Sequence, residues 1–348
     1  MDRAKDLVIP VIDTPEAQNV MCRINYEYGK AALGRDEFDE AYTYLLASNS
    51  YGDADELIRS SKYDRAIAAE ANGEIGAAYE LFNQLGDYKD TLDHMSAIGP
   101  VYGEQAVANE DFLTAYRVYN QIGDTEQAAA LEEAYPWVTI PDAQVGDSVW
   151  FGHYEQDADK SNGTELVEWI VLGRLDDKVM LLAKDNIDLQ QFNEEGEPTN
   201  WEECSLRSWM NENMFADLFA PYEAKRVLLS PVLSATTVET DSNGGDTEDH
   251  LFLLSYDEAA KYLEEGLLPD PEVTAYSESL IRGDHKESEY WLRTMADTGY
   301  AYRIGDSQFW YQTESDYYIG VRPALWFDLT VLEEPEAAEE TEEAEEAQ

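Results

Sequence analysis

Basic side chains are scarce in this sequence. It holds 23 lysines and arginines against 74 aspartates and glutamates, which gives a formal net charge of −51. A surface of this sign repels the phosphates of nucleic acids and the anionic headgroups of membranes. The charge balance therefore argues against a nucleic acid partner.

Cysteine and histidine are also rare. Cys22 and Cys204 are the two cysteines, and they lie far apart outside any Cys-x-x-Cys pattern, so the sequence favours neither a disulfide framework nor a zinc site. The four histidines lack metal-ligand spacing, and the sequence contains no nucleophile elbow and no glycine-rich phosphate loop. We therefore expect a protein that is not an enzyme and needs no cofactor.

Long hydrophobic runs are missing as well. Near the start, "LVIPVI" is too short for the core of a signal peptide or for a membrane span. We expect no direct membrane insertion of this chain. The compartment stays open between the cytoplasm and, if an upstream anchor was removed, the cell envelope or the extracellular space.

Aromatic residues, in contrast, are plentiful at 12%, and 44% of the residues are hydrophobic. This composition excludes a wholly disordered acidic chain, and 348 residues are enough for two domains. We expect a lead segment over residues 1–25. The glutamate-rich stretch 332–348 predicts a disordered acidic tail.

The first third of the sequence repeats itself at an interval of roughly 35 residues. Three segments that begin at Ala32, Ala69 and Ala106 share a small residue, a polar turn and an Ala-Tyr pair, with apolar positions spaced by three and four. Such a pattern predicts stacked helical hairpins over residues 26–138. These units resemble tetratricopeptide-like repeats, which implies either a spacer or a peptide-binding groove.

The pattern changes near residue 138, where Pro136 and Pro141 interrupt the helical spacing and the alternation typical of strands begins. We expect hairpins over residues 167–184 and 299–313, a helix after Cys204, a short buried strand and then a helix capped by Ser255, and a final strand over residues 317–329. The predicted fold is α+β and multidomain: an N-terminal α-solenoid and, over residues 139–331, an antiparallel β domain with short helices.

Seven segments of the second domain carry a family resemblance. In order, they are "VGDSVWFGHYE", "EWIVL", "KVMLLAK", "TNWEECSLRSWMN", "FLLSYDEA", "YWLRT" and "GVRPALW". Together they resemble a bacterial domain family of unknown function that often follows tetratricopeptide-like repeats in Gram-positive envelope proteins. More distantly, the segments are similar to the C-type-lectin-like fold shared with formylglycine-generating enzymes. This resemblance implies a lectin-like β domain, but it does not by itself confer an activity.

Three arginines share an apolar setting: Arg207 in "SLRSW", Arg293 in "YWLRT" and Arg322 in "GVRPA". An unpaired charge there would be costly, so each guanidinium needs a carboxylate, carbonyl groups or an aromatic ring. We predict that these arginines are structural and join core loops. Binding of an anionic ligand is the alternative.

The candidate ligand-binding residues lie in "QFWYQTESDYY". Strand alternation would turn some of its aromatic side chains outward, beside amides, where they would suit stacking on sugars or docking a peptide. The candidates are Trp310, Tyr311, Tyr317 and Tyr318. Packing in the core is the alternative for each.

Calcium is the one metal that the lectin-like resemblance suggests. The glycine-rich stretch "DSNGGDTED" offers Asp241, Asn243, Asp246 and Asp249 as oxygen ligands. It does not fit an EF-hand, which needs glycine where Asp246 stands and glutamate where Phe252 stands. A flexible loop without metal is the main interpretation, and an irregular calcium site is the alternative.

The sequence as a whole predicts a non-enzymatic binding or adhesion protein of the bacterial cell envelope. In this interpretation the repeats form an arm, the second domain recognises a protein or glycan ligand, and the oligomeric state stays open. A formylglycine-generating-like or glycan-active enzyme is one alternative, and a cytoplasmic scaffold that binds through its repeats is the other.

Overall fold

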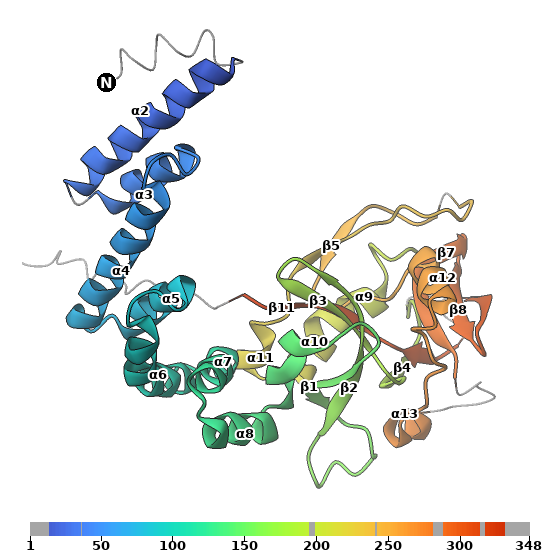
Figure 1. Ribbon diagram of the computed structural model, residues 1–348. Coiled ribbons are helices and arrows are strands. Elements are labelled where there is room, and N and C mark those ends of the chain that lie inside the picture. The colour runs from blue at the N-terminus through green and yellow to red at the C-terminus, as the bar shows by residue number, and fades with distance from the viewer. Residues whose placement is uncertain are drawn as a thin grey trace, which may run out of the picture. The chain divides into compact units, whose positions relative to one another are not determined.

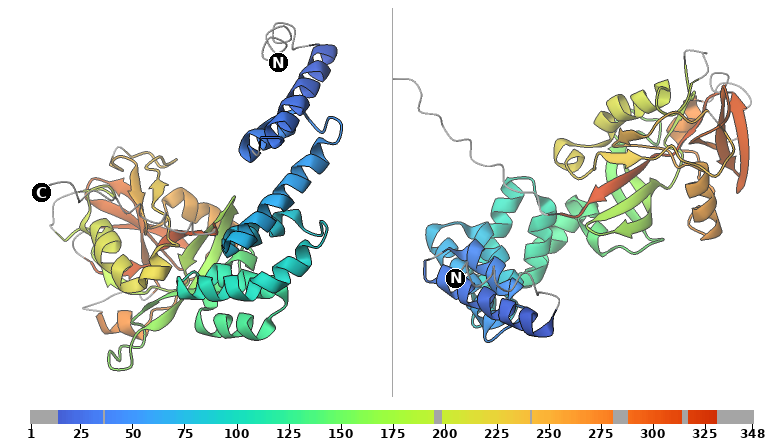
Figure 2. Two further views of the ribbon diagram at one scale, coloured as in Figure 1. Left: turned by 90° about the vertical axis from the view of Figure 1, so that its left-hand side faces the viewer. Right: turned by 90° about the horizontal axis from the view of Figure 1, so that it is seen from above.

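The computed structural model describes residues 14–35, 37–194, 199–240, 242–280, 288–313 and 317–330. The chain divides into two compact units, Met1–Ala128 and Ala129–Gln348. Helices form the first unit, and strands with short helices form the second (Figures 1 and 2). This confirms the predicted α+β class. The predicted acidic tail, 332–348, lies outside the described residues.

The first unit is a series of helices that pack in consecutive pairs, α2 on α3, α4 on α5 and α6 on α7. Its first described helix begins at Pro15, inside the predicted lead segment 1–25. The helices are α2 (Pro15–Leu33), α3 (Phe38–Ala47), α4 (Ala54–Asn72), α5 (Ile75–Leu85), α6 (Thr91–Ala108), α7 (Phe112–Ile122) and α8 (Thr125–Ala134), the last of which spans the division between the units.

Small residues at equivalent repeat positions let the paired helices approach closely. Gly29 of α2 faces Leu45 of α3, and a Cβ on this glycine would lie 2.5 Å from Leu45 Cγ. In the third pair, a Cβ on Gly103 would lie equally close to the ring of Tyr119. The repeat in the sequence is therefore a repeated pairing of a small residue with a large one.

Consecutive repeats also share a hydrogen bond between a tyrosine and an aspartate. The Tyr26 hydroxyl donates to Asp53, and at the equivalent positions the Tyr63 hydroxyl donates to Asp90 at 2.6 Å. The bond to Asp90 is the main cause that raises the pKa of Tyr63 to about 12. The third repeat has Pro100 where this tyrosine would stand, so the bond is not continued.

The second unit contains a four-stranded antiparallel sheet in the order β1-β2-β3-β11. Its strands are β1 (Ser148–Tyr154), β2 (Glu165–Leu175), β3 (Lys178–Ala183) and β11 (Ala324–Asp328). The hairpin of β2 and β3 confirms the one predicted over residues 167–184. One face packs around fully buried aromatic rings, with Phe151 5.1 Å from Phe327 between ring centroids.

A second sheet has the order β4-β10-β7-β8-β9. Its strands are β4 (Asp188–Gln190), β10 (Ile319–Val321), β7 (Tyr290–Asp297), β8 (Tyr300–Gly305) and β9 (Gln308–Thr313). The single final strand predicted over residues 317–329 is wrong: β10 belongs to this sheet and β11 to the first. Arg322 and Pro323 separate them, because proline cannot donate a ladder hydrogen bond.

The remaining elements are short. They are the strands β5 (Ser230–Val232) and β6 (Thr247–Asp249), the 3-10 helix η2 (Pro136–Asp142), the π-helical turn η3 (Met210–Met214), and the helices α9 (Ser205–Trp209), α10 (Phe215–Leu218), α11 (Pro221–Ala224), α12 (Tyr256–Glu264) and α13 (Ala275–Leu280). The predicted cap of α12 by Ser255 is confirmed, and Glu258 completes a capping box with it. The buried strand predicted before it is an isolated bridge between Phe252 and Ala324.

Membrane insertion has no support in the part of the chain that the structure describes. None of its helices combines the length and the apolar character that a membrane span requires.

Candidate functional site

The candidate ligand-binding residues lie on and beside the hairpin of β8 and β9. Asp306 and Ser307 form its two-residue turn, and both have positive φ, 49° and 57°. Positive φ at both positions is typical of a type I′ turn, whose twist matches that of the paired strands. This turn fixes the register, which places Tyr302 opposite Tyr311 and Arg303 opposite Trp310.

One side of this hairpin carries a cluster of aromatic rings, which we call the aromatic face. Tyr311 is 62% exposed and Tyr300 is 40% exposed, and their ring centroids are 6.0 Å apart. Beneath them, Tyr256 at the start of α12 contacts two partly buried rings. The aromatic face consists of Tyr256, Tyr300, Tyr302, Phe309 and Tyr311.

Strand alternation places the predicted candidates on different sides. Trp310 lies opposite Arg303 in the register and therefore points away from the aromatic face, together with Gln308 and Gln312. Tyr317 is exposed and Tyr318 is partly buried, both just before β10. The structure thus brings Tyr311 together with Tyr300 and Tyr302. These two tyrosines were not among the candidates selected from the sequence. A two-residue turn at 306–307 would have indicated that Tyr302 lies opposite Tyr311.

The outer edge of β9 is open in the described part of the chain. β9 is the terminal strand of its sheet and pairs with β8 alone among the described residues. Its sequence, "QFWYQT", contains no charged residue and no proline, the residues that usually block an edge. Backbone groups along this edge are therefore available to an additional strand.

Arg207 and Arg293 each donate hydrogen bonds to a carboxylate and to backbone carbonyl groups. Arg207 Nε donates to Asp249 Oδ1 at 2.7 Å and Nη1 donates to the Glu202 carbonyl at 2.9 Å. Arg293 Nη2 donates to Glu258 Oε1 at 3.0 Å, while Nη1 donates to the other oxygen of this carboxylate and to the Leu253 carbonyl. Arg207 thus joins α9 to β6, and Arg293 joins β7 to the start of α12.

Arg322 is held without a carboxylate among the described residues. It is 1% exposed, Nε donates to the Ala183 carbonyl at 2.8 Å, and Nη1 donates to the Pro269 carbonyl at 3.2 Å. Its guanidinium carbon lies 4.9 Å from the centroid of the Tyr290 ring. These contacts tie the junction of β10 and β11 to β3, to the loop at Pro269 and to β7.

A small cavity adjoins Arg293. Its lining includes Trp201, Ser234, Asn243 and Arg293, and it has room for about one water molecule. A cavity of this size does not hold a sugar or a peptide side chain. The exposed hairpin is therefore the better candidate for ligand binding.

The ion pair of Arg293 and Glu258 predicts a pH dependence. Burial raises the pKa of Glu258, but the hydrogen bonds and the charge of Arg293 outweigh burial, and this pKa lies below its ordinary value. Because the pKa of Glu258 is lower in the folded protein, its ionised carboxylate stabilises the fold fully at pH values above the unfolded-state pKa of about 4.3. This stabilisation is lost as the pH falls through the pKa of Glu258 in the folded state. We expect Glu258→Gln to lower the free energy of unfolding at pH 7, and this deficit to shrink towards pH 3.

Urea unfolding of both proteins between pH 7 and pH 3 measures this deficit. Glu264→Gln, at an exposed position of the same helix, is the matched control and should show no deficit at pH 7. A Glu258→Gln deficit that stays constant down to pH 3 would contradict the assignment.

The described calcium candidates all accept hydrogen bonds from the protein. Asp249 accepts from Arg207 and from Trp201 Nε1, Asp246 accepts from the Ser234 N–H at 2.8 Å, and Asn243 Oδ1 accepts from the Met295 N–H at 2.8 Å. The fourth candidate, Asp241, lies outside the described residues. These contacts serve to order the loop, and the calcium interpretation of it stays an untested prediction.

Cys204 is buried at the start of α9. Its sulfur accepts from the Arg207 N–H at 3.4 Å, and its thiol lies 3.6 Å from the Trp201 carbonyl. The thiol thus caps a helix in the core.

Two buried carboxyl groups have raised pKa values. Burial raises the pKa of Asp188, whose carboxyl accepts from the Tyr154 hydroxyl at 2.6 Å. Burial also raises the pKa of Glu223, which accepts from the Ala220 N–H at 2.9 Å. Each carboxyl is already bonded within the fold, and the two belong to different elements, so they do not form an acid–base pair by these contacts.

A group of three carboxylates was not recognised from the sequence: Glu155, Asp157 and Glu165, at the ends of β1 and β2 and in the loop between them. They are the described residues whose ligand atoms lie close enough together to share a metal ion. The signal in the sequence was an acidic loop, "EQDADKSNGTE", that joins two strands.

Comparisons with curated proteins and with solved structures gave no match. One family model matches, over a range that begins at the β2–β3 turn and ends just after β11. This range contains the three arginines and the aromatic face, while β1 and β2 precede it. Residues 176–329 of the second unit match the family model of a domain of unknown function, DUF6273.

Proposed function

We propose that this protein is a non-enzymatic binding protein whose second unit holds a ligand at the β8–β9 hairpin. The observation that carries the proposal is the aromatic face, where Tyr300 and Tyr311 remain exposed beside an open strand edge. Tyrosine offers a large contact area with little conformational entropy to lose, which makes it common at binding surfaces.

The ligand that fits this hairpin best is an extended peptide. A peptide can add a strand to β9, where backbone hydrogen bonds supply affinity and alternate side chains reach the aromatic face. The chain's net charge of −51 would attract a basic peptide and speed its encounter.

A glycan is the second candidate, and a different side of the hairpin favours it. Trp310 is 45% exposed and lies between Gln308 and Gln312, which are its neighbours on the same side of β9. An exposed indole flanked by amides offers a stacking surface and hydrogen-bonding groups to a sugar ring.

The sequence also suggests a role for each unit, and we include these roles in the proposal. We take the helical unit as a tetratricopeptide-like arm, acting as a spacer or as a docking surface, and the second unit as a lectin-like recognition domain. The resemblance to envelope proteins supports a place at the bacterial cell envelope. The two alternatives are still a formylglycine-generating-like or glycan-active enzyme and a cytoplasmic scaffold that binds through its repeats.

The test is peptide selection with the full chain, followed by titration of the selected peptide. We expect Tyr311→Ala to weaken binding at least about tenfold, because it removes the most exposed ring of the aromatic face, while the unfolding midpoint stays within about 1 °C. Tyr42→Ala, which removes an exposed tyrosine from the helical unit, is the matched control.

Strand addition itself is tested by methylating backbone nitrogens of the selected peptide. Methylation at alternate positions should abolish binding, because it removes the donors that would pair with β9. If the wild type binds a glycan array and Trp310→Ala abolishes this binding, the result would favour a sugar as the ligand. A peptide that binds equally well to the Tyr311→Ala variant would refute the hairpin as its site and favour the helical scaffold.

A further inference from the structure

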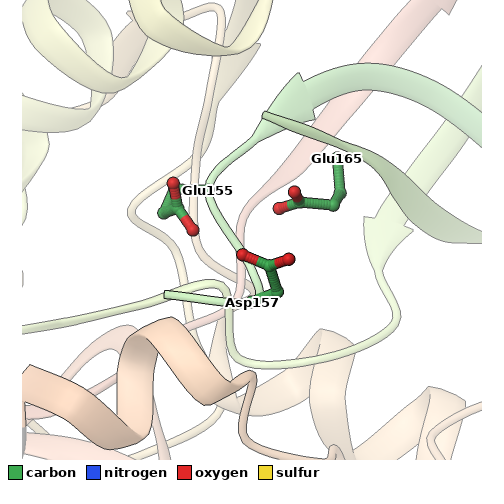
Figure 3. Close-up of side chains that lie close together, drawn as sticks. All are labelled: Glu155, Asp157 and Glu165. Carbon is green, nitrogen blue, oxygen red and sulfur yellow. The ribbon is translucent and has the colours of Figure 1, made fainter. Parts of the chain in front are cut away.

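The loop between β1 and β2 gathers three carboxylates at one point. Glu155 directly follows β1, Asp157 lies two residues further on, and Glu165 begins β2. One oxygen from each lies within 4.8 Å of the others. Figure 3 shows the carboxylate groups of all three directed towards a common centre.

Glu155 is the unusual member of this group. It is 9% exposed, and its Oε1 is buried without a hydrogen-bond partner among the described residues. Burial raises the pKa of Glu155, and the nearby charge of Glu165 raises it further. A buried carboxylate oxygen without a donor is costly, and two neighbouring carboxylates increase that cost.

The other two carboxylates are held in place by donors from the loop. Glu165 Oε2 accepts from the Gln156 N–H at 2.7 Å. Asp157 accepts from the Asp159 N–H at 2.7 Å and from Asn162 Nδ2 at 2.8 Å. Each oxygen keeps a lone pair that these single bonds do not use, so the group is positioned and can still coordinate an ion.

A lysine lies in the same loop, but its recorded contact is with a different partner. Lys160 Nζ lies 5.3 Å from the centroid of the Tyr276 ring, and no ion pair between this lysine and the three carboxylates occurs among the described residues. The negative charge of the group is therefore not balanced by a side chain of the described residues.

We propose that Glu155, Asp157 and Glu165 bind a divalent cation, and that this cation is Ca²⁺. A set made of carboxylate oxygens alone suits a hard cation. A loop between two strands tolerates the flexible, higher-coordination geometry of Ca²⁺ better than the strict octahedron of Mg²⁺, and backbone carbonyls and water would complete the shell.

The cation would connect three elements of the second unit. It would join the end of β1 to the start of β2 and give Glu155 Oε1 the partner that it lacks. It would also fix Gln156, whose carbonyl accepts from the Tyr276 N–H of α13 at 2.9 Å. Binding would therefore stabilise the hairpin and the start of α13 together.

The test is calorimetric titration of the full chain with CaCl2 in 0.15 M KCl after treatment with EDTA, together with thermal unfolding. The salt is needed because a chain of net charge −51 attracts Ca²⁺ diffusely, and salt screens such attraction. We expect a saturable site of about one equivalent, with a higher unfolding temperature when Ca²⁺ is present.

Two variants and a matched control separate this site from diffuse binding. Glu155→Gln and Glu165→Gln should each weaken Ca²⁺ binding at least about tenfold, and in EDTA Glu155→Gln should unfold at the wild-type temperature or above it, because it relieves charge repulsion. Asp176→Asn removes an exposed acid from the neighbouring β2–β3 turn and should bind Ca²⁺ as the wild type does.

Three results would overturn the proposal. The first is a titration without saturation, and the second is equal Ca²⁺ stabilisation of the wild type and Glu155→Gln, which would assign a bound proton to Glu155 instead of a metal. The third is equal loss of binding in Asp176→Asn. Tighter binding of Mg²⁺ than of Ca²⁺ would overturn the choice of cation.

Discussion

Replacing Arg322 by alanine is expected to lower the free energy of unfolding of the second unit by about 3 kcal/mol. The side chain is 1% exposed, and its loss leaves a cavity against Tyr290. It also leaves the carbonyls of Ala183 and Pro269 without these donors. Because Arg322 has no carboxylate partner among the described residues, the variant leaves no buried carboxylate unpaired there. The lost free energy of unfolding comes from lost packing and from unpaired carbonyl groups.

Urea unfolding followed by tryptophan fluorescence measures this effect selectively, since all eight tryptophans lie in the second unit. Arg59→Ala, at an exposed position of the helical unit, should leave the transition unchanged. Arg322→Lys keeps a cation but loses the planar donor pair, so we expect an intermediate loss. Unchanged stability in Arg322→Ala, combined with loss of ligand binding, would reassign this arginine to recognition.

A loss of similar size, about 3 kcal/mol, is expected for Gly152→Ala in β1. Gly152 has φ of +70°, which L residues rarely adopt, and it lies where the register of β1 and β2 shifts. A Cβ there would lie 2.8 Å from the Leu218 carbonyl oxygen and 2.7 Å from the Phe219 ring. The backbone carbonyl of Leu218 cannot move aside as a flexible side chain can. The strain of alanine at positive φ and the overpacking against this carbonyl therefore both lower the free energy of unfolding.

Gly173→Ala is the matched control for this substitution. Gly173 lies in the neighbouring strand β2, also at a shift in register, but a Cβ there would meet nothing within 4 Å. We expect Gly173→Ala to be neutral or to stabilise by up to about 1 kcal/mol, because alanine reduces the freedom of the unfolded chain. Equal losses in the two variants would show that the contact with Leu218 is not the cause.

Local signals in the sequence predicted much of the fold. The cap at Ser255, the hairpin over residues 299–313 and the repeated spacing of apolar residues in the helical unit each depend on positions close together in the chain. Such patterns are strong because hydrogen bonds and packing within one hairpin decide them.

Features that depend on distant segments were not predicted. The run 317–329 is apolar almost throughout, and no local pattern shows that its two halves pair with different strands, β10 with β4 and β11 with β3. The candidate site shows the same limit. Tyr311 was selected from its own strand, but Tyr256, which supports the aromatic face from α12, is distant in the sequence.

The pairing of β10 and β11 has a consequence for biosynthesis. Strands β3 and β4 emerge from the ribosome early, but their partners β11 and β10 lie more than a hundred residues later in the chain. The helical unit can form while the chain is still being made, since each helix packs on its neighbour in sequence. The second unit must instead wait until residues 319–328 are synthesised, so the edge of β3 that pairs with β11 stays exposed to chaperones and to aggregation until then.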